Sequence, residues 1–259
     1  MVKVRILNIV VFIKQVPDTD DVKWTASNNI DRVNTESILN PVDRHAIASA
    51  LKLKEQYNAR ITAVSMGPNK AAEILKEAIA LGVDDAALLS DSKFIGSDTC
   101  ATSKVLSAAI KEKFPDTNLI LFGQSASDGE TAQTGPSTAV RLSYPFITNV
   151  SEITEINDNN ITVISENEFE KITYTVKLPA VLCINNSIYS LSLPKIDGYI
   201  KAHDYNYKIY NISELRLKDD ETGIKGSPTY VSKVYRHDEY RNCLMLNTDE
   251  LLNKIKEVC

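Results

Sequence analysis

The stretch GQSASDGETAQTGP occupies residues 123–136 and directly follows a short apolar run, LILF, at residues 119–122. A run this short and rich in large apolar residues is typical of a strand that is buried on both faces. Residues 137–142 then show an Ala/Val/Leu pattern typical of a helix. Pro136 suits the first turn of that helix, where its missing N–H has no partner to lose. We therefore predict a strand, a loop of small residues and the start of a helix.

Such a loop can bind a phosphate, because free main-chain N–H groups and the positive end of a helix dipole meet there. Many strand-to-helix loops of small polar residues bind nothing, so both interpretations stay open at this point. Asp128 and Glu130 would repel a phosphate that they faced. We expect these two carboxylates to point instead to the helix cap, to sugar hydroxyls or to basic groups.

The composition narrows the class of protein. The chain has 259 residues and a formal net charge of -5, so it permits one large domain with or without an appendage. The lack of a basic excess argues against a nucleic-acid partner. No apolar run approaches the ~20 residues that a membrane span needs. Residues 1–14 lack the cleavage site of a signal peptide, so we expect a cytoplasmic protein without a membrane span.

Motifs that carry chemistry are absent. The four cysteines and three histidines are scattered and form no CxxC pair, so we expect free thiols and no metal site. The chain has no GxGxxG fingerprint, no Walker A lysine loop and no GxSxG elbow, and we nominate no catalytic residue. A phosphate-binding loop without a catalyst favours a protein that holds a nucleotide cofactor and lets the cofactor react.

Strand and helix patterns alternate along the first 150 residues. We expect strands at residues 8–13, 60–65, 86–89, 119–122 and 146–148, with helices between them. Asn40 suits the N-cap of the first helix, with Pro41 at its first position, and Gly82 suits the C-cap of the second. Alternation with short connections predicts an α/β fold: a Rossmann-like parallel sheet with helices on both faces, of the kind that binds adenine nucleotides.

Three segments depart from this alternation. Residues 20–37 suggest a small hairpin packed down by Trp24, and residues 151–184 suggest antiparallel strands that extend the sheet. Residues 189–259 show little periodicity before a helix at 249–258. We expect two units, an α/β domain at 1–188 and a C-terminal arm at 189–259 that lies on a partner subunit. The alternative is a tail that packs back on its own domain.

Several motifs in order resemble the small (beta) subunit of an electron transfer flavoprotein. The resemblance covers residues 3–184, and a weaker similarity continues to the end of the chain. The motifs are KQVPDT at 14–19, NPVD at 40–43, ITAVSMGP at 61–68, AIALGVD at 78–84, GSDT at 96–99 and the loop at 123–136.

The resemblance implies an adenine-nucleotide-binding domain that pairs with a larger alpha subunit carrying an FAD. In this family the beta subunit holds AMP in simple electron carriers. In electron-bifurcating members it holds a second FAD, which accepts hydride from NADH. The loop at 128–136 resembles the bifurcating type, so the resemblance favours FAD, with AMP as the alternative. A stand-alone adenine-nucleotide-binding regulatory protein is a further alternative from a different class.

The resemblance also implies which residues bind the cofactor. Around the adenosine end it places Phe12, Asn40, Pro41, Val42, Asp43 and Met66. Around the phosphates, mainly through main-chain N–H groups, it places Gly123, Gln124, Ser125, Ala126, Ser127, Asp128, Gly129, Glu130, Thr131, Ala132, Gln133 and Thr134.

Two departures from the family pattern stand out. Gln124 and Ser125 replace a common lysine–glutamine pair, which removes a cation near the nucleotide. Residues 185–201 differ from the usual loop that docks on an acyl-CoA dehydrogenase, and the candidates for an apolar anchor there are Leu193, Pro194 and Ile196. The implied partners are the alpha subunit, an acyl-CoA-dehydrogenase-like flavoenzyme and, for the bifurcating type, ferredoxin.

Overall fold

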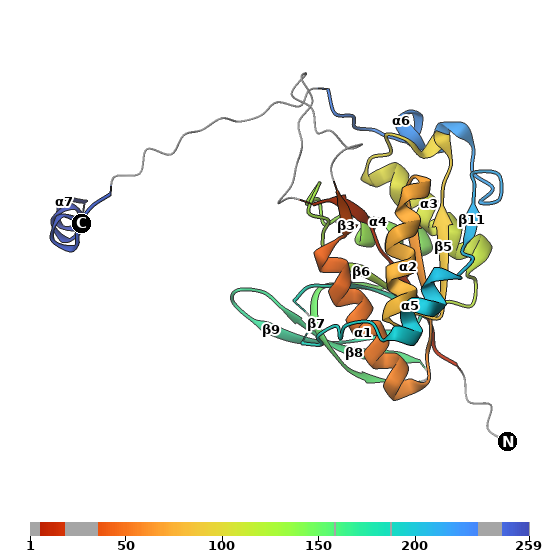
Figure 1. Ribbon diagram of the computed structural model, residues 1–259, viewed down its shortest axis with the longest axis horizontal. Helices are drawn as coiled ribbons and strands as arrows, with labels where there is room; N and C mark the ends of the chain where they lie inside the picture. Colours follow the sequence, from red (N-terminus) through yellow and green to blue (C-terminus); the bar gives the residue numbers. More distant parts are fainter. Residues whose placement is uncertain (1–5, 19–35, 158, 187, 233–244, 259) are drawn as a thin grey trace.

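The computed structural model describes residues 6–18, 36–157, 159–186, 188–232 and 245–258. Its centre is a twisted sheet with helices packed on both faces (Figure 1). The described strands of this sheet, from one edge to the other, are β11 (Lys208–Tyr210), β5 (Asp85–Leu89), β4 (Arg60–Met66), β1 (Asn8–Phe12), β6 (Leu119–Gly123), β10 (Ala180–Ile184), β7 (Phe146–Ile156), β8 (Asn160–Glu166) and β9 (Lys171–Lys177).

Neighbouring strands run parallel from β11 to β7, and β8 and β9 add antiparallel pairs at the other edge. A separate small sheet pairs β2 (Gln15–Pro17) with β3 (Ser37–Leu39). The sequence-based prediction of a mainly parallel α/β fold with an antiparallel extension is confirmed.

Alternating side chains of the central strands enter two separate cores. Ile9 and Val11 of β1 face α1 (Pro41–Tyr57) and α2 (Ala72–Leu81), whereas Val10 and Phe12 face α3 (Thr99–Lys113) and α4 (Thr134–Leu142). Successive side chains of a strand point to opposite faces, so burial of both faces requires a nearly continuous apolar run. This requirement explains why the central strands lack polar alternation.

Capping groups define two helix boundaries, and the one at Gly82 lies where the sequence predicts it. Gly82 ends α2 in the left-handed conformation, with φ 117°, and its N–H caps the helix by donating to the carbonyls of Ala78 and Ile79. Asp98 starts α3, and its carboxylate accepts a hydrogen bond from the N–H of Ala101. Both residues satisfy main-chain groups that a helix end leaves unpaired.

Strand β10 corrects one expectation. We expected antiparallel strands throughout residues 151–184, but β10 lies in the sheet interior and runs parallel to both β6 and β7. All five residues of β10 are buried. Because any strand buried on both faces reads as an apolar run, the sequence does not say which neighbours such a strand has.

Residues 196–226 pack back on the α/β domain. α5 (Ile196–His203) packs on α2, and β11 pairs with β5 at the sheet edge. The hydroxyl of Tyr205 accepts a hydrogen bond from the N–H of Ala86 at 2.9 Å and bonds the Asp85 carboxylate. α6 (Gly223–Gly226) lies at the amino end of α3, where Asp98 accepts hydrogen bonds from the N–H and hydroxyl of Thr229.

The remaining elements are short or terminal. The 3-10 turns are η2 (Asn69–Ala71), η3 (Ser92–Phe94) and η4 (Asp219–Glu221). α7 (Thr248–Val258) confirms the predicted C-terminal helix. Most of the predicted hairpin at 20–37, including Trp24, lies outside the described residues.

Candidate functional site

The loop that the sequence singles out leaves the carboxyl end of β6 and runs to α4. The first turn of α1 and the residues after β1 lie at the same end of the sheet, where the parallel strands have their carboxyl ends. In open parallel sheets, ligands bind outside the carboxyl ends of the strands. The fold therefore brings the predicted loop and the NPVD segment to the position where such a fold accepts a ligand.

Asn40 connects these two segments. It lies at the N-cap position of α1, as predicted, but its side chain makes no capping hydrogen bond. Instead its Nδ2 donates to the Ser125 carbonyl at 2.9 Å, and its Oδ1 accepts from the N–H of Ser127 at 3.3 Å. The buried amide of Asn40 thus clamps the first part of the loop onto α1.

Asp43 joins three segments from inside the protein. Its buried carboxylate accepts hydrogen bonds from the N–H of Lys14 at 2.7 Å and from the N–H of Gly123 at 3.2 Å, and it also bonds Asn40. Burial raises the pKa of Asp43 to about 7, although these hydrogen bonds act in the opposite direction.

Gly123 must be glycine for this contact to form. A Cβ built on it would overlap Oδ1 of Asp43 and would lie 2.8 Å from the main-chain N of Asp43. Gly129 is different, because a Cβ there has no neighbour within 4 Å. The first glycine allows close packing of β6 against α1, whereas the second borders open space.

One of the two loop carboxylates is paired with a cation. Oδ1 of Asp128 lies 2.6 Å from Nζ of Lys14. The expectation that Asp128 points to a basic group is confirmed. Lys14 reaches this loop from the segment that follows β1.

The second half of the loop leaves main-chain N–H groups free. Thr131, Ala132, Thr134 and Gly135 donate to no acceptor in the described part of the chain. The backbone of Ala132 has the left-handed conformation, with φ 52°, and that of Gln133 has the right-handed helical conformation, with φ -103°. When successive residues alternate between left-handed and right-handed backbone conformations, their N–H groups point into one concave surface that can bind an anion. These amides also begin α4, where the helix dipole favours a negative charge.

The other predicted site residues take various positions at this edge. Phe12 is buried and stacks on Phe122, with ring centroids 4.9 Å apart, and the half-buried Met66 packs into the same core. Pro41 and Val42 form the first turn of α1 beside Gly123. Gln124 donates its N–H to the Ile184 carbonyl, and its Oε1 accepts from the N–H of Asn149 at 2.8 Å.

Sequence reasoning missed two contributors to this edge. Lys14 lies in the KQVPDT motif but is not among the predicted site residues, and the available signal was its position directly after the predicted strand at 8–13. Asn149 contributes only its main chain, so no side-chain pattern identifies it.

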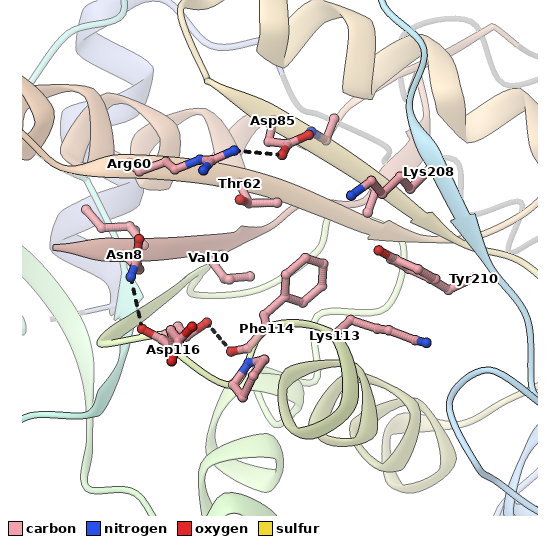
Figure 2. Close-up of a pocket in the computed structure, with 15 residues that line it drawn as sticks. Asn8, Val10, Arg60, Thr62, Asp85, Lys113, Phe114, Asp116, Lys208 and Tyr210 are labelled. Carbon is pink, nitrogen blue, oxygen red and sulfur yellow. Dashed lines mark hydrogen bonds and ion pairs between the residues drawn. The ribbon is translucent and has the colours of Figure 1, made fainter. Parts of the chain in front are cut away.

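A cavity of about 220 Å³ lies at the opposite end of the strands, beside the amino ends of β1, β4 and β5 (Figure 2). Three of its charged side chains have partners within the lining: Arg60 pairs with Asp85 at 3.3 Å, and Nζ of Lys113 lies 5.0 Å from the ring centre of Tyr210. Since it also lies away from the carboxyl ends of the strands, we place the candidate site at the loop instead.

The described residues contain no group of three or more His, Cys, Asp and Glu side chains placed to hold a metal ion. None of their helices is both long enough and apolar enough to cross a bilayer.

Comparison with known proteins gives a consistent result. The model of the electron transfer flavoprotein domain matches residues 28–203. The electron transfer flavoprotein subunit beta of Megasphaera elsdenii is 36% identical over 94% of this chain and 93% of its own length. The caffeyl-CoA reductase-Etf complex subunit CarD of Acetobacterium woodii is 36% identical over 88% and 87%. The acryloyl-CoA reductase electron transfer subunit gamma of Anaerotignum propionicum is 35% identical over 88% of each chain.

The family model covers more than half of the chain, and these relatives align along most of it. The match also runs through the β6–α4 loop and the NPVD segment, which the fold brings to one edge. The chain is therefore a member of the electron transfer flavoprotein family and belongs with its beta subunits.

Proposed function

We propose that this chain is the beta subunit of a heterodimeric electron transfer flavoprotein that binds FAD at the carboxyl edge of its sheet. In this proposal the subunit accepts hydride from NADH and bifurcates the electrons. One goes to the FAD of the alpha subunit and then to an acyl-CoA-dehydrogenase-like flavoenzyme, and the other goes to ferredoxin. The observation that carries the proposal is the set of free N–H groups at Thr131, Ala132 and Thr134 in front of α4.

The residues at this edge suit a dinucleotide with two phosphates. The free N–H groups of the loop supply donors without charge, and Lys14 supplies a cation close to them. The open space at Gly129 leaves room on the outer side of the loop. When bound, FAD supplies a centre that takes two electrons at once and releases them singly.

The hydrogen bonds of Asn40 and Asp43 would hold the loop ready for the ligand. Both side chains are buried, and both bond to main-chain groups of residues that flank or form the loop. A loop that is already ordered loses less entropy when it binds, so these bonds favour affinity. We assign Asn40 and Asp43 to holding the loop, and the loop itself to holding the phosphates.

The names of two relatives guide the choice of partner. CarD belongs to a caffeyl-CoA reductase-Etf complex, and another relative is an electron transfer subunit of acryloyl-CoA reductase. Both names point to enzymes that act on acyl-CoA compounds. Leu193 is 91% exposed and Ile196 is 79% exposed, and we propose that they anchor such a flavoenzyme together with Pro194.

The bound nucleotides of the purified heterodimer test this proposal. The complex is denatured, and released FAD and AMP are counted per heterodimer by chromatography and mass spectrometry. Two FAD molecules support the proposal. One FAD with one AMP supports the alternative, an electron carrier whose beta subunit holds a structural AMP. One FAD with no second nucleotide overturns the assignment of a nucleotide site to this chain.

A further inference from the structure

Lys14 lies outside the set of site residues that the sequence predicts, and the role inferred for it below rests on the proposed function. Lys14 lies two residues after β1, and both its main-chain N–H and its carbonyl are hydrogen-bonded. Its N–H donates to Asp43 at 2.7 Å, and its carbonyl accepts from the N–H of Asn40 at 2.9 Å. The main chain of Lys14 is therefore fixed relative to the loop, whereas its side chain is 48% exposed and its ammonium pairs with Asp128.

The charge of the loop explains why a cation is needed there. Residues 115–140 contain no Lys, Arg or His, whereas the loop carries Asp128 and Glu130. Among the described residues, no other basic side chain forms an ion pair with this loop. A diphosphate would bring further negative charge to an already acidic loop, and repulsion would oppose its binding unless a cation compensated it.

The Lys14 ammonium has the capacity to do this. An ammonium group carries three N–H donors, and the contact with Asp128 uses one of them. The remaining donors are free to bond phosphate oxygens without breaking the ion pair. Asp128 then orients the ammonium, and the neighbouring main-chain N–H groups complete the anion site.

We propose that Lys14 is a cofactor-binding residue whose ammonium bridges Asp128 and the phosphates of the bound adenine nucleotide. The ligand class that it selects is a nucleotide with at least one phosphate, as opposed to the free nucleoside.

Calorimetric titration of the nucleotide-depleted heterodimer with ADP and with adenosine tests this assignment. For Lys14→Gln we expect the affinity for ADP to fall about tenfold or more, because a charge-assisted hydrogen bond is lost. We expect the affinity for adenosine to change less than about twofold, since adenosine carries no phosphate. The loss should shrink as the salt concentration rises, because salt screens an exposed charge.

Two matched variants keep the result interpretable. Lys14→Arg retains the charge and should retain most of the ADP affinity. Lys52→Gln removes a lysine from the exposed surface of α1, where it pairs with Glu55, and should change neither affinity. All variants are compared with wild type by thermal unfolding to confirm that they are folded.

Two outcomes would overturn the role of Lys14: unchanged ADP affinity in Lys14→Gln, or an equal loss for ADP and adenosine. An equal loss would mean that Lys14 only shapes the loop. Failure of the wild-type heterodimer to bind either compound would instead contradict the proposed function. The two failures are therefore distinguishable.

Discussion

The carboxylate of Asp43 accepts a hydrogen bond from the N–H of Gly123 at 3.2 Å, and this contact joins the first turn of α1 to the end of β6. The two residues are far apart in the sequence, yet each constrains the other. Asp43 needs main-chain donors because it is buried, and Gly123 must lack a Cβ because Asp43 occupies that space. The contact sets the point from which the candidate loop starts.

Replacement of Gly123 by alanine should damage this edge. The added Cβ would overlap the Asp43 carboxylate and press on the α1 main chain, so we expect Gly123→Ala to cost about 1–3 kcal/mol of unfolding free energy and to lower nucleotide retention. Urea unfolding measures the first effect. Gly129→Ala is the control, because its Cβ meets nothing within 4 Å. Equal stability of the two variants would contradict the packing argument.

Gly129→Arg should separate binding from folding. Gly129 does not have a positive φ and borders open space, so the longer side chain need not strain the fold. We expect it to fill the phosphate site and abolish flavin retention while the unfolding midpoint stays near that of wild type. Flavin absorbance of the purified heterodimer measures retention. Normal flavin content in a folded Gly129→Arg variant would remove the site assignment.

Asp43 should make stability depend on pH. Its pKa in the folded chain is raised from 3.8 to about 7, so between these pH values the folded chain holds one proton that the unfolded chain has lost. This group alone therefore lowers the unfolding free energy as pH rises from about 4 to 7, by up to about 4 kcal/mol, and has no further effect above that range.

Asp43→Asn tests the sign of this dependence. The variant loses the titrating group. The NH₂ of the new asparagine would also face a main-chain N–H, so two donors would meet without an acceptor. We therefore expect the variant to be less stable than wild type. The deficit should be larger at pH 5 than at pH 8, because wild type alone gains stability from protonation at low pH. Urea unfolding at pH 5, 6, 7 and 8 measures the difference, with Asp116→Asn as a control for removal of one carboxyl group. A constant deficit across this range would contradict the raised pKa.

Asn40→Ala should release the loop from α1. The variant loses the bonds to Ser125 and Ser127 and leaves a buried gap, so we expect a loss of about 1–3 kcal/mol in unfolding free energy. Asn40→Asp keeps the acceptor for Ser127 but cannot donate to Ser125. If Asn40 were only a helix cap, aspartate would replace it at little cost. Equal stability of wild type and Asn40→Asp would thus disprove the clamp.

The apolar face of α7 should contact the partner subunit. Leu251, Leu252 and Ile255 are each 50% exposed and lie at helical spacing on one side of the helix. We expect their joint replacement by serine to weaken the heterodimer in size-exclusion chromatography without lowering the unfolding midpoint of the isolated chain. Asn253→Ser with Lys256→Ser on the same helix is the matched control. A stable heterodimer with the triple variant would rule out this role.

The sequence predicted the fold well where local patterns decide it. Strand β1, the start of α1 at Pro41 and the end of α2 at Gly82 each follow from an apolar run, a proline or a glycine that suits its position. The place of β10 between β6 and β7 did not follow, because apolar runs identify burial and not neighbours. The same limit applies to residues 196–226, whose weak periodicity left their packing partner open.

For the candidate site, the sequence by itself determined the loop, its small residues, its acidic charge and the helix that follows, because turns, caps and buried strands depend on neighbouring residues. Only the tertiary structure decided that Asn40 clamps the loop, that Asp43 is buried under Gly123 and that Lys14 faces Asp128. These contacts join residues 80 to 114 positions apart. No local pattern specifies such pairs, since the parallel order of β1 and β6 is what brings them together.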